Sequence, residues 1–80
     1  MPKGLHNWTY REVADFLKEQ DFTLYNERKG SHEAWISKDR TAVVEVNFIQ
    51  GNESYPIRTL ETMIRQSKLD KKEWRKWASQ

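Results

Sequence analysis

The sequence predicts a single α+β domain in which one helix is followed by three antiparallel strands, a second long helix and a short helical segment. Apolar residues recur at helical spacing near both ends of the chain, and in the middle they alternate with polar residues between short turns. Eighty residues leave room for one core, so we expect a single domain at 1–80, with a loose arm at 1–8 and the folded part at 9–77. Helices that cover one face of a three-stranded sheet would form a small two-layer sandwich.

The first helix is predicted at residues 10–20 because a capping signal precedes its apolar pattern. Thr9 and Glu12 have the spacing of a capping box, in which each side chain accepts a hydrogen bond from the backbone N–H of the other residue. Trp8 stands directly before this box and is expected to pack on Val13. The apolar face of the helix then consists of Val13, Phe16 and Leu17.

Three strands are predicted at residues 22–28, 33–37 and 41–48, where apolar and polar residues alternate. Their buried faces are expected to consist of Phe22 and Leu24, then Ala34 and Ile36, then Ala42, Val44, Val46 and Phe48. The outer face of the sheet would carry Tyr25, Trp35, Glu45 and Asn47. Because the connecting turns are short, the three strands should form an antiparallel meander.

The turn between the first two strands holds the most distinctive residues of the chain. Pairing the apolar faces of these strands requires a loop of odd length, because a one-residue slip exchanges the two faces. A three-residue loop at 29–31, with Gly30 at a positive φ, meets this requirement and places Arg28 opposite His32. His32 should then lie at the rim of the core, at the open end of the hairpin. Glu33 follows it on the strand, so the Glu33 side chain should point to the opposite face.

The C-terminal part is predicted to form a long helix and a short one. Thr59 is positioned to cap the long helix, whose core face would consist of Leu60, Met63 and Ile64. Residues 70–73 form a second capping pattern. The short helix after it carries Trp74 and Trp77 three residues apart, and we expect these side chains to hold the helix on the core.

Composition excludes several classes of function. The chain has no Cys, so disulfides and thiolate metal sites are excluded. No apolar run is long enough for a membrane span, and we expect a cytoplasmic protein with no membrane partner. His6 and His32 share no ligand spacing with a carboxylate pair, so neither a metal nor another cofactor is expected. The net charge is only +2, but six bases lie close together near the end: Arg65, Lys68, Lys71, Lys72, Arg75 and Lys76.

Three features together resemble the HicA toxins, a family of small ribonucleases from toxin–antitoxin pairs. They are the order of the elements, the Gly30-Ser31-His32 turn, and the Thr-Leu-x-x-Met-Ile-Arg-Gln-Ser-Lys-Leu stretch at residues 59–69. The resemblance covers residues 9–77 and implies a fold like that of the double-stranded-RNA-binding domain. Where many members of the family have a His near the end of the third strand, this chain has Asn47.

The resemblance implies a metal-independent endoribonuclease that cleaves mRNA and is inhibited by a HicB-type antitoxin. His32 would be the single catalytic residue, since histidine exchanges protons near neutral pH and RNA supplies its own 2′-hydroxyl nucleophile. The surrounding residues would bind the RNA: Arg28, Lys29, Gly30, Ser31 and Lys38. Positive side chains suit the phosphate, and a Gly lets the backbone approach it closely.

Two alternatives use the same fold without catalysis. In the first, the domain binds RNA through the bases of the last two helices, His32 is dispensable, and the affinity falls steeply with salt. In the second, the domain binds another protein through Tyr25 and Trp35 on the outer face of the sheet. The acidic residues expected on that face would repel phosphate, so its aromatic side chains suit a protein partner better than RNA.

Overall fold

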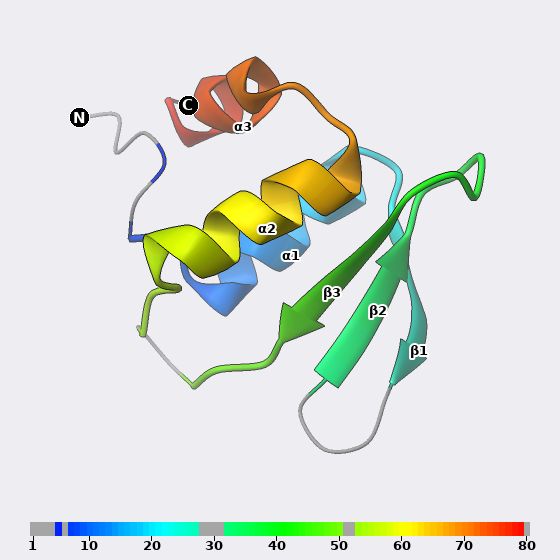
Figure 1. Cartoon of the computed structure of the whole chain (residues 1–80), viewed down its shortest axis with the longest axis horizontal. Helices are drawn as coiled ribbons and strands as arrows, with labels where there is room; N and C mark the ends of the chain where they lie inside the picture. Colours follow the sequence, from blue (N-terminus) through cyan, green and yellow to red (C-terminus); the bar gives the residue numbers. More distant parts are fainter. Residues whose placement is uncertain (1–4, 6, 28–31, 51–52, 80) are drawn as a thin grey trace.

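The computed structural model describes residues 5, 7–27, 32–50 and 53–79, and it confirms the predicted order of elements (Figure 1). The chain forms α1 (Tyr10–Glu19), β1 (Thr23–Glu27), β2 (His32–Ile36), β3 (Val43–Asn47), α2 (Ile57–Ser67) and α3 (Lys71–Ala78). The three strands form one antiparallel sheet in the order β1-β2-β3. No helix among the described residues is both long and apolar enough to cross a membrane.

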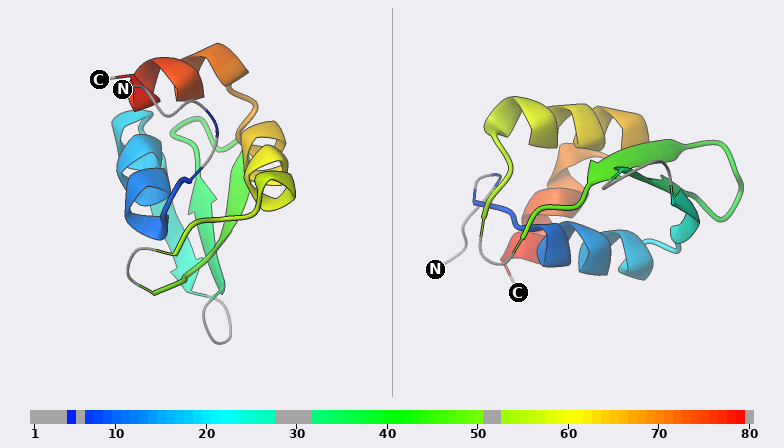
Figure 2. Two further views of the ribbon diagram at one scale, coloured as in Figure 1. Left: turned by 90° about the vertical axis from the view of Figure 1, so that its left-hand side faces the viewer. Right: turned by 90° about the horizontal axis from the view of Figure 1, so that it is seen from below.

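The helices lie on one side of the sheet. α1 and α2 run side by side over the same sheet face, and α3 lies across one end of this pair (Figure 2). The opposite face of the sheet carries no helix. The predicted α+β sandwich with its helices on one face is therefore confirmed.

An aromatic cluster joins the beginning of the described fold to its end. Trp8, Phe16 and Trp74 are fully buried. The ring centroids of Phe16 and Trp74 lie 4.3 Å apart, and those of Trp8 and Trp74 lie 5.4 Å apart. The partly buried Trp77 adds a fourth ring, and its indole N–H donates to the Glu19 carboxylate. The prediction that both tryptophans of the last helix hold it on the core is confirmed.

The helix ends agree with the sequence signals at two of three places. Thr9 and Glu12 form the complete capping box of α1, and the Asp70 carboxylate accepts from the Lys72 N–H at the start of α3. The prediction that Thr59 caps the long helix is wrong. α2 begins three residues earlier than a Thr59 cap would place it, and its N-cap is Pro56, which provides no side-chain hydrogen bond. A proline tolerates this position because its fixed φ suits the start of a helix.

The first hairpin has the predicted register next to its turn but not further along. Glu27 pairs with Glu33, as a loop at 29–31 requires, although the loop residues themselves lie outside the described part of the chain. Between Leu24 and Asn26 the register shifts by one residue, so that Leu24 lies opposite Trp35. Leu24 was expected in the core and is instead 41% exposed. The bulge places Leu24 on the same face as the buried Trp35, yet Leu24 stays exposed on β1, an edge strand of the sheet, and the alternation alone did not indicate this bulge.

The side chains of β2 face the opposite sides of the sheet from those predicted. Trp35, expected on the outer face, is only 3% exposed and pairs with Val44 on the face that the helices cover. A buried indole removes more apolar surface from water than the side chain of either Ala34 or Ile36 can, and Ala34 is itself only 1% exposed. Phe48, expected in the core, lies beyond the end of β3, is 47% exposed and packs its ring edge-on against Tyr10.

A buried serine connects α2 to α3, and its removal tests how the C-terminal helix is held. The Ser67 side chain is 2% exposed; its hydroxyl donates to the Ile64 carbonyl and accepts from the Leu69 N–H and the Trp74 indole N–H. Ser67→Ala leaves two buried donors without this acceptor. We expect the free energy of unfolding to fall by about 1–3 kcal/mol in urea denaturation.

The matched control is Ser79→Ala, which removes an exposed hydroxyl that donates to the Arg75 carbonyl. This variant should change the free energy of unfolding by less than about 0.5 kcal/mol. Equal effects of the two substitutions would contradict the role assigned to Ser67.

Candidate functional site

His32 is the first residue of β2, and its side chain is exposed on the face of the sheet that carries no helix. It shares this face with Ala34 and Ile36, as predicted, but the core lies on the other face, with Trp35 and Val44. His32 therefore does not share its face of the sheet with the core residues Trp35 and Val44. Its neighbour across the strand pair is Asn47 on β3, and such pairs place their Cβ atoms about 5 Å apart.

A polar hollow of about 250 Å³ opens beside His32, between the sheet and α2. We call it the His32 hollow. Its lining comes from three elements and combines one imidazole, one carboxylate, two amides and two hydroxyls with a single apolar side chain. The lining residues are His32 of β2, Glu45 and Asn47 of β3, and Thr59, Thr62, Met63 and Gln66 of α2.

Two side chains hold the C-terminal end of α2 against β3 and against the residues just before this strand. The Gln66 side-chain carbonyl accepts from the Glu45 backbone N–H at 3.0 Å. The Lys68 ammonium donates to the Thr41 carbonyl at 2.8 Å. β3 is an edge strand, and its outward backbone groups would otherwise stay open to another strand. These contacts fix one wall of the His32 hollow relative to the other.

Tyr55 supports the end of β3 from the interior. Its buried phenol donates to the Asn47 backbone carbonyl. Burial raises the pKa of the Tyr55 phenol well above its usual value, and the neighbouring Tyr10 and Glu33 add to this effect. The backbone of Asn47 is thus held from the core side, while its side chain lines the His32 hollow on the other.

Glu33 does not orient the His32 imidazole, as its place on the strand predicted. Its carboxylate accepts from the Tyr10 phenol at 2.9 Å and from the Trp35 indole N–H at 3.1 Å. These partners keep the carboxylate on the sheet face opposite to His32. Within the described part of the chain, no group of three or more His, Asp or Glu residues could hold a metal ion.

Of the other predicted site residues, the described structure includes only Lys38. Arg28, Lys29, Gly30 and Ser31 lie outside the described residues. Lys38 lies in the turn after the opposite end of β2, and the strand between them spans about 13 Å, so Lys38 is not beside His32.

Sequence reasoning missed the contribution of α2 and of Glu45 to the site. Thr59, Thr62 and Gln66 are spaced three and four residues apart, so they share one side of the helix. This polar row next to the apolar face was visible in the sequence, but nothing in the sequence indicated that it would lie against His32.

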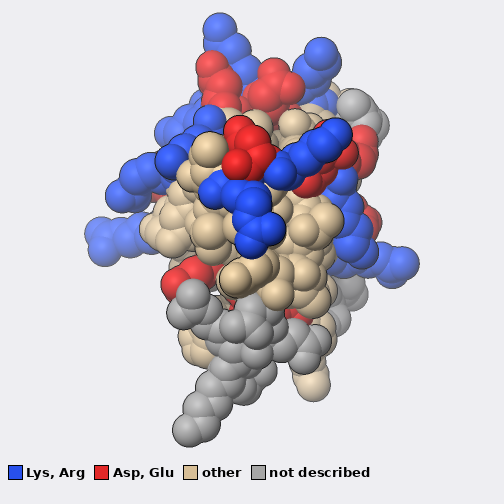
Figure 3. Space-filling view, turned by 90° about the vertical axis from the view of Figure 1, so that its right-hand side faces the viewer, with Lys and Arg blue, Asp and Glu red and all other residues tan. Residues whose placement is uncertain are grey.

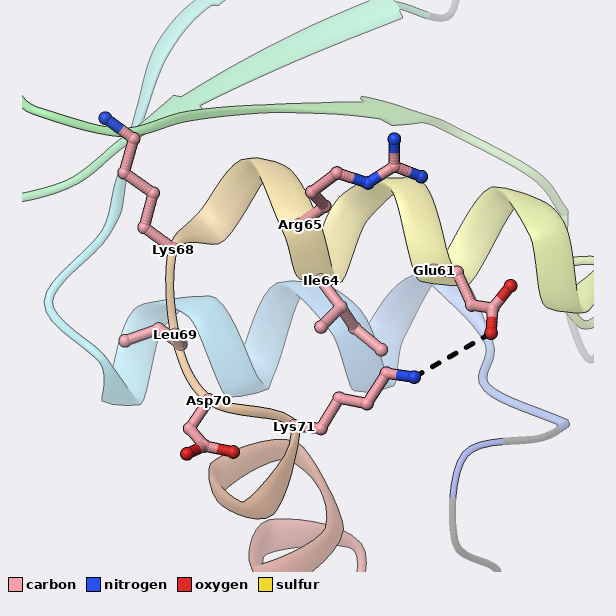
Figure 4. Close-up of a pocket in the computed structure, with 7 residues that line it drawn as sticks. All are labelled: Glu61, Ile64, Arg65, Lys68, Leu69, Asp70 and Lys71. Carbon is pink, nitrogen blue, oxygen red and sulfur yellow. Dashed lines mark ion pairs between the residues drawn. The ribbon is translucent and has the colours of Figure 1, made fainter.

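The basic residues near the C-terminus do not line the His32 hollow. Lys and Arg side chains lie along the top, both sides and the upper middle of this view, with Asp and Glu among them, and a mainly uncharged area lies below them (Figure 3). A larger hollow of about 670 Å³ beside α2 and the start of α3 contains Arg65, Lys68 and Lys71 (Figure 4). Lys71 turns to Glu61, with 3.9 Å between the ammonium and carboxylate atoms.

The comparisons with known proteins add no relative. No family model matches the sequence, and neither a curated protein nor a solved structure matches it significantly. A functional assignment therefore rests on the residues, on their arrangement, and on the sequence resemblance at residues 30–32 and 59–69.

The raised pKa of the Tyr55 phenol predicts a pH dependence of stability. The folded protein keeps this proton at pH values where an unfolded tyrosine, with a pKa of about 10, has lost it. The resulting stabilisation is complete below pH 10 and is lost as the pH rises above it. Tyr55→Phe should lower the free energy of unfolding at pH 7 by about 1 kcal/mol, through the lost hydrogen bond to Asn47.

Urea denaturation at pH 7 and between pH 10 and 11.5 measures both effects. The native protein should lose stability more steeply than Tyr55→Phe over the alkaline range. Tyr25→Phe is the matched control, because Tyr25 is 59% exposed, and its alkaline slope should equal that of the native protein. Equal slopes for all three proteins would refute the assignment.

Proposed function

We propose that this protein is a HicA-like endoribonuclease that cleaves mRNA without a metal, with His32 as its single catalytic residue and a HicB-like antitoxin as its inhibitor. The proposal includes a double-stranded-RNA-binding-domain-like fold for the α-β-β-β-α part of the chain. One observation carries it: the histidine of the HicA-like turn has an exposed side chain beside a polar hollow between the sheet and α2. A buried or paired imidazole at this position would have argued against the proposal.

The chemistry needs little machinery because the substrate supplies the nucleophile. In the proposed reaction the 2′-oxygen of one ribose attacks the neighbouring phosphorus, and the bond from phosphorus to the 5′-oxygen breaks. The products are a 2′,3′-cyclic phosphate and a 5′-hydroxyl end. The His32 imidazole transfers a proton to or from one of these two oxygens. Water accepts or supplies the proton at the other oxygen. A positioned acid or base of this kind contributes about 10²–10⁴-fold to the rate.

Positive charge near the phosphate would come from the turn itself. Arg28 and Lys29 precede Gly30 and Ser31 in the sequence, directly before His32. Lys38, at the far end of β2, would contact a more distant phosphate of an RNA strand that crosses the sheet. An antitoxin that covers the exposed His32 would block the substrate at the same place.

The two alternatives fare differently. A non-catalytic RNA-binding domain is favoured by exposed bases of α2 and α3 that do not line the His32 hollow: Arg58, Arg65, Lys72, Arg75 and Lys76. A protein-binding surface made of Tyr25 and Trp35 is not available as a pair, because Trp35 is buried in the core.

Cleavage by His32→Ala tests the proposal directly. Purified native protein and the variant are incubated with a structured and an unstructured RNA in the presence of a metal chelator. The native protein should cut, and the variant should be about 10²–10⁴-fold slower because it lacks the proton-transfer group. Filter binding at several salt concentrations should show that both proteins still bind RNA.

His6→Ala is the matched control, because it removes the other histidine of the chain and should cut like the native protein. If the native protein binds RNA with a steep salt dependence but never cuts, the domain is an RNA-binding module and the enzyme proposal fails. Cleavage that stops when the chelator is added would refute the metal-independent mechanism.

A further inference from the structure

We propose that the His32 hollow is a nucleobase-binding site that recognises guanine next to the bond that is cut. The inference rests on the proposed function, because it names what the enzyme reads at that site. It concerns the residues of β3 and α2, whose roles the resemblance does not supply. Three properties of the hollow support this inference: the charge of its lining, the orientation of its hydrogen-bonding groups, and its position relative to His32.

The lining of the hollow suits a neutral polar ligand better than a phosphate. Among the described residues its lining has no Lys or Arg, and it includes the Glu45 carboxylate, which would repel an anion. Amide and hydroxyl groups from Asn47, Gln66 and Thr62 provide the rest of its polarity. At about 250 Å³ the hollow is smaller than the 300–1,000 Å³ typical of sites for drug-sized ligands, which suits one ring system.

The structure fixes the direction of two of these groups. The Gln66 side-chain oxygen accepts from the Glu45 backbone N–H, so the Gln66 amide nitrogen keeps its two donors for a ligand. The Thr62 hydroxyl donates its proton to the Arg58 carbonyl, so its oxygen can only accept. The hollow therefore offers a donor from Gln66 and acceptors from Thr62 and from the Glu45 carboxylate.

Guanine is the base whose edge matches this arrangement. Its Watson–Crick edge has two adjacent N–H donors, which a carboxylate can accept together, and a carbonyl oxygen next to them for an amide donor. Adenine would present a ring-nitrogen acceptor to the carboxylate, and the edges of uracil and cytosine each offer only one donor position. Glu45 would bind the donors of guanine, and Gln66 would bind its carbonyl oxygen.

The hollow is close enough to His32 to bind a base of the nucleotide that is cut. His32 lies opposite Asn47, and Glu45 is two residues further along the same face of β3. Diagonal neighbours of this kind in a sheet lie about 7–8 Å apart. A base held by Glu45 would therefore keep its own ribose near the imidazole.

Nucleoside binding tests the site without any cleavage. The ¹⁵N-labelled native protein is titrated separately with guanosine, adenosine, cytidine and uridine, and with ribose 5-phosphate as the phosphate probe. Guanosine should shift the signals of the Glu45 backbone N–H and the Gln66 side-chain amide at the lowest concentration. Equal shifts by the four nucleosides, a stronger effect of ribose 5-phosphate, or no shift at these groups would overturn the proposal.

Two isosteric substitutions test the roles of the named groups. Glu45→Gln replaces one carboxylate oxygen by a donor, and Gln66→Glu removes the amide donor while keeping an acceptor for the Glu45 N–H. Each should weaken guanosine binding about tenfold or more, within the range of one good base contact. Glu61→Gln is the matched control, because Glu61 lies outside the hollow, and it should bind guanosine like the native protein. A loss of binding in the control, or its retention in both variants, would contradict the assignment.

Cleavage of DNA strands that contain a single ribonucleotide separates this proposal from the proposed function. The native protein should cut fastest where the ribonucleotide is guanosine, and Glu45→Gln should reduce this preference. Cleavage of all four substrates at equal rates would refute the guanine site but leave the ribonuclease intact. Selective guanosine binding by a protein that cuts none of the substrates would support the base site and refute the enzyme.

Discussion

The burial of Trp35 against Val44 decides which face of the sheet remains open. Because side chains alternate along a strand, an indole that points into the core sends His32 and Ala34 to the opposite side. The Glu33 carboxylate, which shares the side of Trp35, is tolerated there because Tyr10 and Trp35 itself donate to it. The exposure of the His32 side chain is thus a consequence of core packing at Trp35, three residues away.

The hollow beside His32 exists because α2 is fastened to an edge strand. Gln66 and Lys68 use backbone groups of Glu45 and Thr41 that a further strand would otherwise pair with. The same hydrogen bond that closes the edge also orients the Gln66 amide toward the hollow. One hydrogen bond therefore both protects the edge of the sheet and shapes the His32 hollow.

The sequence predicted the features that depend on local spacing. It did not predict those that depend on which face of a strand packs against the helices. The Thr9 capping box, the order of elements and the Glu27–Glu33 register next to the turn follow from short-range patterns, and the structure confirms them. The inward turn of Trp35 and the bulge in β1 could not be predicted, because either face of these strands offered apolar residues. Part of the candidate site was equally hidden, since its α2 residues approach His32 only in the folded chain.

Asn47 belongs to two environments at once, because its carbonyl is held by the buried Tyr55 and its side chain lines the open hollow. Sequence changes in the core and in the candidate site are consequently coupled through Asn47. A substitution in the core near Tyr55 would displace the end of β3, and this would change the surface even though no surface residue had been substituted. Selection for a different substrate could therefore act on residues that no substrate ever touches.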